Sequence, residues 1–233
     1  MKYTATALRG IAPLLFGLLS LSLLCCTTDA YDKGEGDYSL MVAEMADIQV
    51  NHDKQAVSAV TDEGQRLLFA QPFTINWFTT ADSVYRAVLY YNKVATDGGS
   101  EENGYAVEPI GVNRVSVLLP HRIDSMKCDP VRLESIWLST TKRYLNAGIY
   151  VMVGNSGDDD LKQVLGLGVD TLVVNDDGRS RLDLTLYHDQ GGMPEYYSQR
   201  AYVSVPLDSL NVDTVSLRIN TYEGTVLKKF GLR

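Results

Sequence analysis

The chain has 233 residues, of which 45% are hydrophobic, and its 29 acidic residues outnumber 21 basic ones to give a net charge of −8 at pH 7. This apolar fraction is typical of globular proteins, and the length suits one large domain or two small ones. Nucleic-acid binding requires clustered lysine and arginine, and the sequence has no dense basic patch. We therefore expect no nucleic-acid partner.

The first segment, residues 1–25, has the pattern of a secretory signal. A basic head without acidic residues precedes the uncharged apolar run 11–24. This run is shorter than the roughly 20 residues of a membrane-spanning helix. It ends in Leu23-Leu24-Cys25-Cys26, which resembles the lipobox of bacterial lipoproteins. We expect cleavage after residue 25 and lipid attachment to Cys26, which places the protein in the cell envelope, anchored in the outer membrane by its N-terminal lipid.

Two alternatives to lipidation of Cys26 stay open. A lipobox has an aliphatic residue three places before the cysteine and a small residue directly before it. Leu23 and Cys25 fill these positions for Cys26, whereas bulky Leu24 directly precedes Cys25. Cys25 is therefore the second candidate for the acceptor, and a plain signal peptide with two incidental cysteines is the other alternative.

Cysteine positions also limit disulfides and metal sites. If Cys26 carries lipid, Cys128 is left as a free thiol, whereas lipidation of Cys25 leaves Cys26 and Cys128 to pair. The sequence contains no CxxC motif and no cysteine–histidine cluster, so we expect no structural zinc. We expect no cofactor either.

The predicted elements begin after an acidic, glycine-containing tether at residues 26–37. Short runs of β-branched and aromatic residues between turn signals predict strands at 38–50, 55–60, 66–70, 84–94 and 105–119. Asp62-Glu63-Gly64 predicts a tight turn in which Gly64 supplies a positive φ. About five strands joined by hairpins indicate a small barrel over residues 38–119.

A polar stretch after Pro120 marks a boundary, and residues 120–233 form the second predicted domain. Apolar residues recur at period two at Leu182, Leu184 and Leu186, directly after the turn sequence 175–178. Similar runs at 131–139, 149–153, 161–174, 202–205, 215–219 and 225–232 give about seven strands. The pattern predicts an all-β chain whose second domain is an antiparallel β-sandwich.

The order of these parts resembles the NigD-like lipoproteins of gut and oral bacteria. The lipobox is followed by "GDYSLMVAEM", "ADSVYRAVLYYNKV", "DPVRLESIWLS", "YLNAGIYVMVGN" and "RLDLTLYHDQ". The resemblance implies an N-terminal OB-type barrel, a C-terminal β-sandwich, a lipid anchor and no established catalytic residues. The family's name derives from a bacteriocin gene cluster, which makes immunity one hypothesis. Many relatives have consecutive acidic residues after the cysteine, whereas Thr27 and Thr28 follow it here, so the face of the membrane stays open.

Candidate catalytic and metal sites have simpler interpretations. The run 158–160 consists of three aspartates, but it lacks the spacing of a calcium loop and is typical of a solvated loop. His188 precedes Asp189, yet adjacent residues on a strand face opposite ways. Ser125 and Ser198 lack the context of a nucleophile. We therefore expect a protein that is not an enzyme, without catalytic residues or a bound metal.

Two aromatic groups are candidates for binding. Residues Trp77, Phe78, Tyr85, Tyr90 and Tyr91 gather in the barrel, where core filling is a better interpretation than glycan stacking.

The run Met193-Pro194-Glu195-Tyr196-Tyr197 follows two glycines and predicts an aromatic loop. Met193, Tyr196 and Tyr197 are the candidate contacts with a protein or glycan partner. The leading hypothesis is a non-enzymatic envelope lipoprotein that binds such a partner. The alternatives are a glycan hydrolase and an accessory subunit of an envelope assembly.

Overall fold

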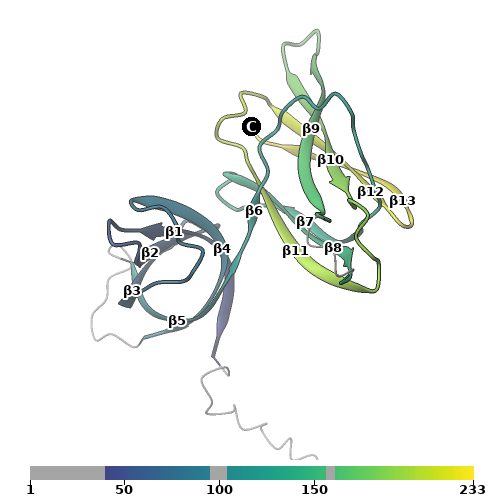
Figure 1. Cartoon of the computed structure of the whole chain (residues 1–233). Helices are drawn as coiled ribbons and strands as arrows, with labels where there is room; N and C mark the ends of the chain where they lie inside the picture. Colours follow the sequence, from purple (N-terminus) through teal and green to yellow (C-terminus); the bar gives the residue numbers. More distant parts are fainter. Residues whose placement is uncertain (1–39, 95–103, 156–160) are drawn as a thin grey trace, which may run out of the picture. The chain divides into compact units, whose positions relative to one another are not determined.

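The computed structural model describes residues 40–94, 104–155 and 161–233 (Figure 1). The described residues fold into strands connected by turns and loops, and they contain no helix that is long and apolar enough to cross a membrane. Residues 40–233 form one compact unit. The predicted lipid acceptor Cys26, its alternative Cys25, the tether and the three aspartates at 158–160 lie outside the described residues.

The first five strands close into a barrel with the order β1-β2-β3-β5-β4 (Figure 1). β1 pairs antiparallel with both β2 and β4, and a parallel pairing of β3 with β5 completes the ring. This strand order is that of an OB-type barrel, so the predicted fold class of the first domain is confirmed. The strands are β1 (Val42–Val50), β2 (Ala56–Thr61), β3 (Arg66–Phe73), β4 (Ser83–Lys93) and β5 (Tyr105–Arg114).

The tight turn between β2 and β3 is formed as the sequence predicts. Gly64 has a φ of 84°, a conformation that side chains with a Cβ rarely adopt. Its N–H donates to the carbonyl oxygen of Thr61 at 2.9 Å. The turn brings Asp62 and Glu63 to one end of the barrel.

The remaining strands form two four-stranded sheets with the orders β6-β11-β8-β7 and β13-β12-β10-β9. Most pairs are antiparallel, as predicted for a β-sandwich, but β6–β11 and β10–β12 are parallel. β10 and β12 run the same way because the chain crosses to the other sheet through β11 and returns. The strands are β6 (Ser116–Val117), β7 (Arg132–Leu138), β8 (Tyr144–Val153), β9 (Val164–Val174), β10 (Ser180–Asp189), β11 (Tyr197–Pro206), β12 (Thr214–Thr221) and β13 (Gly224–Gly231).

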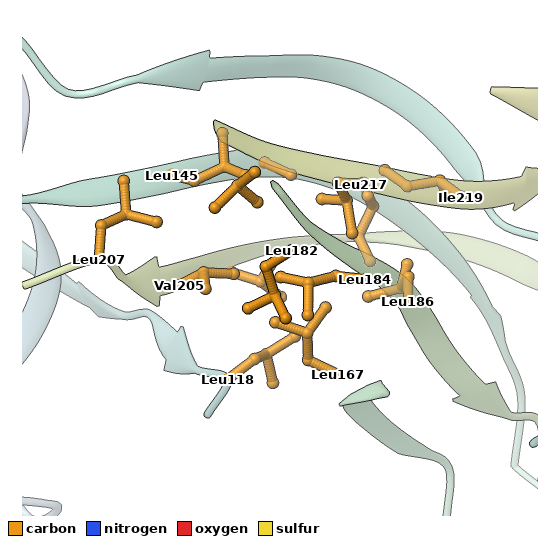
Figure 2. Packing of buried hydrophobic residues seen from close by; sticks show 14 of the residues in the cluster. Leu118, Leu145, Leu167, Leu182, Leu184, Leu186, Val205, Leu207, Leu217 and Ile219 are labelled. Atoms are coloured by element: carbon orange, nitrogen blue, oxygen red, sulfur yellow. The ribbon is translucent and has the colours of Figure 1, made fainter. Parts of the chain in front are cut away.

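The sandwich core lies between these two sheets (Figure 2). Leu182, Leu184 and Leu186 are all buried, so the period-two pattern of β10 marks its inner face. Figure 2 shows them among side chains from β8, β11 and β12, such as Leu145, Val205 and Leu217. Burial of this face holds the two sheets together.

The chain enters the sandwich earlier than the predicted domain limits of 119 and 120. β6, at Ser116–Val117, pairs with Val203 and Ser204 of β11 and so belongs to the sandwich sheet. A break of one residue at Val115, whose N–H donates to the carbonyl oxygen of Arg86, separates β5 from β6. The apolar run 105–119 conceals this break, because Val115 is itself apolar and buried.

Candidate functional site

A buried arginine, Arg86 on β4, ties the barrel together at its sandwich end. Its side chain is only 2% exposed. Nη2 donates to Asp62 Oδ1 at 2.6 Å, and Nη1 donates to Asp47 Oδ1 at 3.3 Å. Both carboxylates belong to the barrel, so the charge of the guanidinium is compensated within it.

The sandwich supplies the other partners of Arg86. Nη2 also donates to Asn146 Oδ1, and Nε donates to Ser204 Oγ, both at 3.1 Å. The ring of Tyr144 lies 3.9 Å from the guanidinium carbon, a cation–π distance. Burial and the negative charge of Asp47 raise the pKa of the Tyr144 phenol. This set of hydrogen bonds joins the barrel to the sandwich and leaves no accessible reactive group, so its role is structural.

The predicted aromatic loop lies between β10 and β11 and is strongly exposed. We call residues 190–197 the tyrosine loop, of which Tyr197 is also the first residue of β11. The side chains of Tyr196 and Tyr197 are 74% and 59% exposed, and Met193 is half-buried. Tyrosine is of intermediate burial on average, so two adjacent tyrosines this exposed form a notable aromatic surface.

Hydrogen bonds hold the backbone of the tyrosine loop. Gln190 Nε2 donates to the carbonyl oxygens of Met152 at 2.8 Å and Met193 at 3.1 Å. Gln163 Nε2 donates to Gln190 Oε1 at 2.6 Å, which fixes the orientation of that amide. The N–H of Tyr196 donates to the carbonyl oxygen of Val153 at 3.1 Å. The loop is therefore anchored to β8 at both of its ends.

Gly154, directly after β8, permits this close approach. A Cβ placed on Gly154 would lie 2.8 Å from Pro194 Cβ, from the Pro194 carbonyl oxygen and from Tyr196 Cδ2. Any larger residue at position 154 would displace the loop. Because glycine has no side chain, the loop can pack directly against the backbone of residue 154.

A third tyrosine of this domain, Tyr222, is also strongly exposed. It lies in the turn between β12 and β13 and is 52% exposed. Partial burial and the negative charges of Glu195 and Asp129 raise the pKa of its phenol. The sequence prediction missed Tyr222 because no local pattern links position 222 with position 196.

The histidine and serine candidates do not converge on a catalytic arrangement. The His188 imidazole is buried, and because the carbonyl oxygen of Asp129 can only accept, Nδ1 donates to it at 2.9 Å. His188 Nε2 is buried without a hydrogen-bond partner. Asp189 instead pairs with Lys127 at 2.6 Å. Within the described parts of the chain, no three histidine, cysteine, aspartate or glutamate residues are grouped to hold a metal ion.

Cys128 carries a free thiol of intermediate exposure. Burial, together with the charges of Asp170 and Asp129, raises the pKa of this thiol. Because the thiolate is the nucleophilic form, Cys128 is a weak nucleophile at neutral pH.

The barrel aromatics mainly fill the core. Phe78 and Tyr91 are buried, and Trp77 and Tyr85 pack against the same core cluster. The centroids of the Trp77 and Phe78 rings are 4.8 Å apart in an edge-to-face arrangement. The core-filling interpretation is confirmed for these four residues, whereas Tyr90 lies outside the barrel core, in a separate cluster with Trp137 and Tyr202.

Comparison with known proteins agrees with this architecture. Residues 115–230 match the family model described as the NigD-like C-terminal beta sandwich domain. Through this domain the chain belongs to the NigD-like family. The NigD-like match covers β6 to β13 apart from the last residue of β13, and it confirms the predicted family. A search of curated proteins finds no match.

Three solved structures share the fold of this NigD-like chain. A NigD-like immunity protein from Bacteroides caccae is 21% identical, with 82% of this chain and 96% of that chain covered and a TM-score of 0.63. A protein of unknown function from Bacteroides vulgatus is 18% identical, with 82% and 90% covered and a TM-score of 0.60. A candidate lipoprotein from Bacteroides fragilis is 11% identical, with 82% and 96% covered and a TM-score of 0.53. At these identities the likeness establishes the fold alone.

Proposed function

We propose that this chain is a non-enzymatic binding protein of the cell envelope that holds a protein partner through the tyrosine loop. The observation that carries the proposal is the combination of exposed rings and a fixed backbone at Tyr196 and Tyr197. Tyrosine is enriched in protein interfaces because it offers a large, amphipathic contact area with few rotatable bonds. A backbone that is already ordered loses little conformational entropy on binding.

The proposal includes anchoring in the outer membrane by lipid on Cys26, with Cys25 as the alternative acceptor. The lipobox-like sequence and the short acidic tether support it. One structural relative is described as a candidate lipoprotein, which agrees with this location. Several acyl chains anchor durably, because each buried methylene contributes about 0.8 kcal/mol.

A protein partner is also what an immunity role would require. The relative from Bacteroides caccae is described as an immunity protein, and this chain shares its fold. The hydrolase alternative has less support, because the carboxylates of buried Asp47 and half-buried Asp62 are both paired with Arg86. A general acid or nucleophile needs a carboxyl group that faces substrate.

Site-specific crosslinking in intact cells tests the proposal. A photoreactive p-benzoylphenylalanine at position 196 should give an adduct that contains a second protein, identified by mass spectrometry. The same residue at position 172, where Leu172 is also exposed, is the matched control and should not give that adduct.

Gly154→Ala distinguishes a fixed loop from a merely exposed one. The added methyl group pushes the tyrosine loop away from β8, so the adduct at position 196 should be lost while the protein stays folded. An adduct that appears equally from position 172, that survives Gly154→Ala, or that consists of glycan would contradict the proposal.

A further inference from the structure

A groove lies between the barrel and the outer face of the β6-β11-β8-β7 sheet. The barrel side consists of β1, β4 and the turn after β2, and the sandwich side consists of β7 with the residues after it and β11. Its volume is about 370 Å³. Small-molecule sites have volumes of about 300–1,000 Å³ and often occur where domains meet.

The floor of the groove is apolar and aromatic. Met45 and Val88 contribute buried side chains from the barrel. Tyr90, Trp137 and Tyr202 pack against them and are only half-buried. Three partly exposed rings from three different strands therefore border one hollow. Ring faces of this kind attract cations as well as apolar groups. The guanidinium carbon of Arg200 already lies 5.7 Å from the centroid of the Tyr202 ring, so Tyr90 and Trp137 are the rings assigned to the ligand.

The rim of the groove carries carboxylates and no basic side chain. The Asp62 carboxylate is compensated by Arg86, but Glu44 and Glu63 are not compensated by a cation in the described chain. Glu44 accepts a hydrogen bond from the Tyr91 hydroxyl at 2.8 Å, and burial together with this carboxylate raises the pKa of that phenol. Glu63 is exposed in the turn. The groove therefore has a negative rim above an aromatic floor.

We infer that this groove binds a small organic cation, an ammonium group carried on an apolar body. The apolar body would lie against Met45, Val88 and the rings, and the ammonium group would face Glu63 and the carboxylate of Glu44. Glu44 lies on the other face of β1 from Met45 and accepts a hydrogen bond from Tyr91. The carboxylates repel an anion of the same shape, and a neutral analogue leaves them without a charged partner. The groove residues do not include the tyrosine loop, so this inference is independent of the proposed function.

Tryptophan fluorescence provides a direct measurement, because the chain has two tryptophans, Trp77 and Trp137. In a Trp77→Phe background the full-length protein in detergent reports on Trp137 in the groove. Titration with phenethylammonium should give a saturable change in fluorescence. The uncharged 2-phenylethanol has nearly the same shape and should bind at least about tenfold more weakly.

Removing the rim charges tests the assigned groups. Glu44→Gln together with Glu63→Gln should weaken phenethylammonium binding by about tenfold or more, while the amide oxygen introduced at position 44 can still accept the hydrogen bond from Tyr91. Glu223→Gln makes one of these charge changes on an exposed residue outside the groove and should leave binding unchanged. Circular dichroism of each variant confirms that the fold is kept.

Three outcomes would overturn the inference. The first is an absence of saturable binding up to millimolar phenethylammonium. The second is equal binding of 2-phenylethanol, which would show that the charge plays no part. The third is binding that the double substitution leaves intact, or that Glu223→Gln weakens equally. None of these results bears on crosslinking at position 196.

Discussion

The carboxylate of Asp213 accepts two hydrogen bonds from Ser180, one from the backbone N–H at 2.8 Å and one from the hydroxyl at 3.1 Å. Asp213 directly precedes β12, and Ser180 begins β10. These bonds, with smaller contributions from Arg233 and Arg179, hold the pKa of Asp213 below its ordinary value of 3.8. A carboxyl whose pKa is lower in the folded than in the unfolded chain stabilises the fold only while it is ionised.

Acid unfolding therefore gives a prediction for Asp213. Its contribution is present above the unfolded pKa of 3.8 and is lost as the pH falls through the lower folded pKa. We expect Asp213→Asn to lower the free energy of unfolding at pH 7. As the pH falls into the acid range, the free energy of unfolding of this variant should decrease less than that of the unsubstituted protein. Urea unfolding at a series of pH values measures both effects, and an unchanged pH dependence would contradict the assignment.

The lipid anchor is also a prediction about single residues. Cys26→Ala should release the protein from membranes and abolish acyl labelling, because the thioether to the lipid requires that thiol. Cys25→Ala should leave both unchanged. Fractionation and labelling with an alkyne fatty acid measure the result. If Cys25→Ala loses the label while Cys26→Ala keeps it, the acceptor is Cys25.

At the scale of elements, β9 and β10 pair along most of their length and place leucines in opposite environments. Leu184 on β10 is 1% exposed and lies in the sandwich core, whereas Leu172 on β9 is 56% exposed. The same truncation should therefore have very different effects. We expect Leu184→Ala to lower the free energy of unfolding by about 2–5 kcal/mol, because it removes contacts and leaves a cavity.

Leu172→Ala is the matched control, with an expected change within about 0.5 kcal/mol. Both values come from urea unfolding followed by far-UV circular dichroism. Equal losses for the two variants would contradict the assignment of Leu184 to the core and of Leu172 to solvent.

At the scale of the whole molecule, the Arg86 cluster joins two domains that each have their own core. Arg86→Met leaves the buried carboxylate of Asp47 and the half-buried one of Asp62 without this guanidinium, and we expect a loss of about 3–5 kcal/mol in the free energy of unfolding. The loss should also uncouple the domains, so that one unfolding transition becomes two. Differential scanning calorimetry measures this change.

Arg179→Met is the control for the loss of an arginine. Arg179 is exposed, and its Nε lies 3.7 Å from Asp177 Oδ2, so its removal should change stability by at most about 1 kcal/mol. A single, unshifted transition in Arg86→Met would contradict a coupling role for the cluster.

Several features follow from local sequence and were predicted correctly. The positive φ of Gly64 was predicted from the turn in which it lies, and the inner face of β10 from leucines at period two. The all-β class and the division into a barrel and a sandwich follow from strand patterns and from the resemblance to the NigD-like family. Such features are local because turns and strand faces are set by neighbouring residues.

By itself, the sequence determined the class of fold, the sidedness of its strands and an expected lipid acceptor, because these depend on residues within a few positions of one another. Only the tertiary structure brought Arg86 to Ser204 and Trp137 to Tyr90. Arg86 and Ser204, for example, are 118 positions apart in the chain. Composition and periodicity cannot predict such contacts. They depend on how the chain crosses between the sheets, which decides which strand faces pack together.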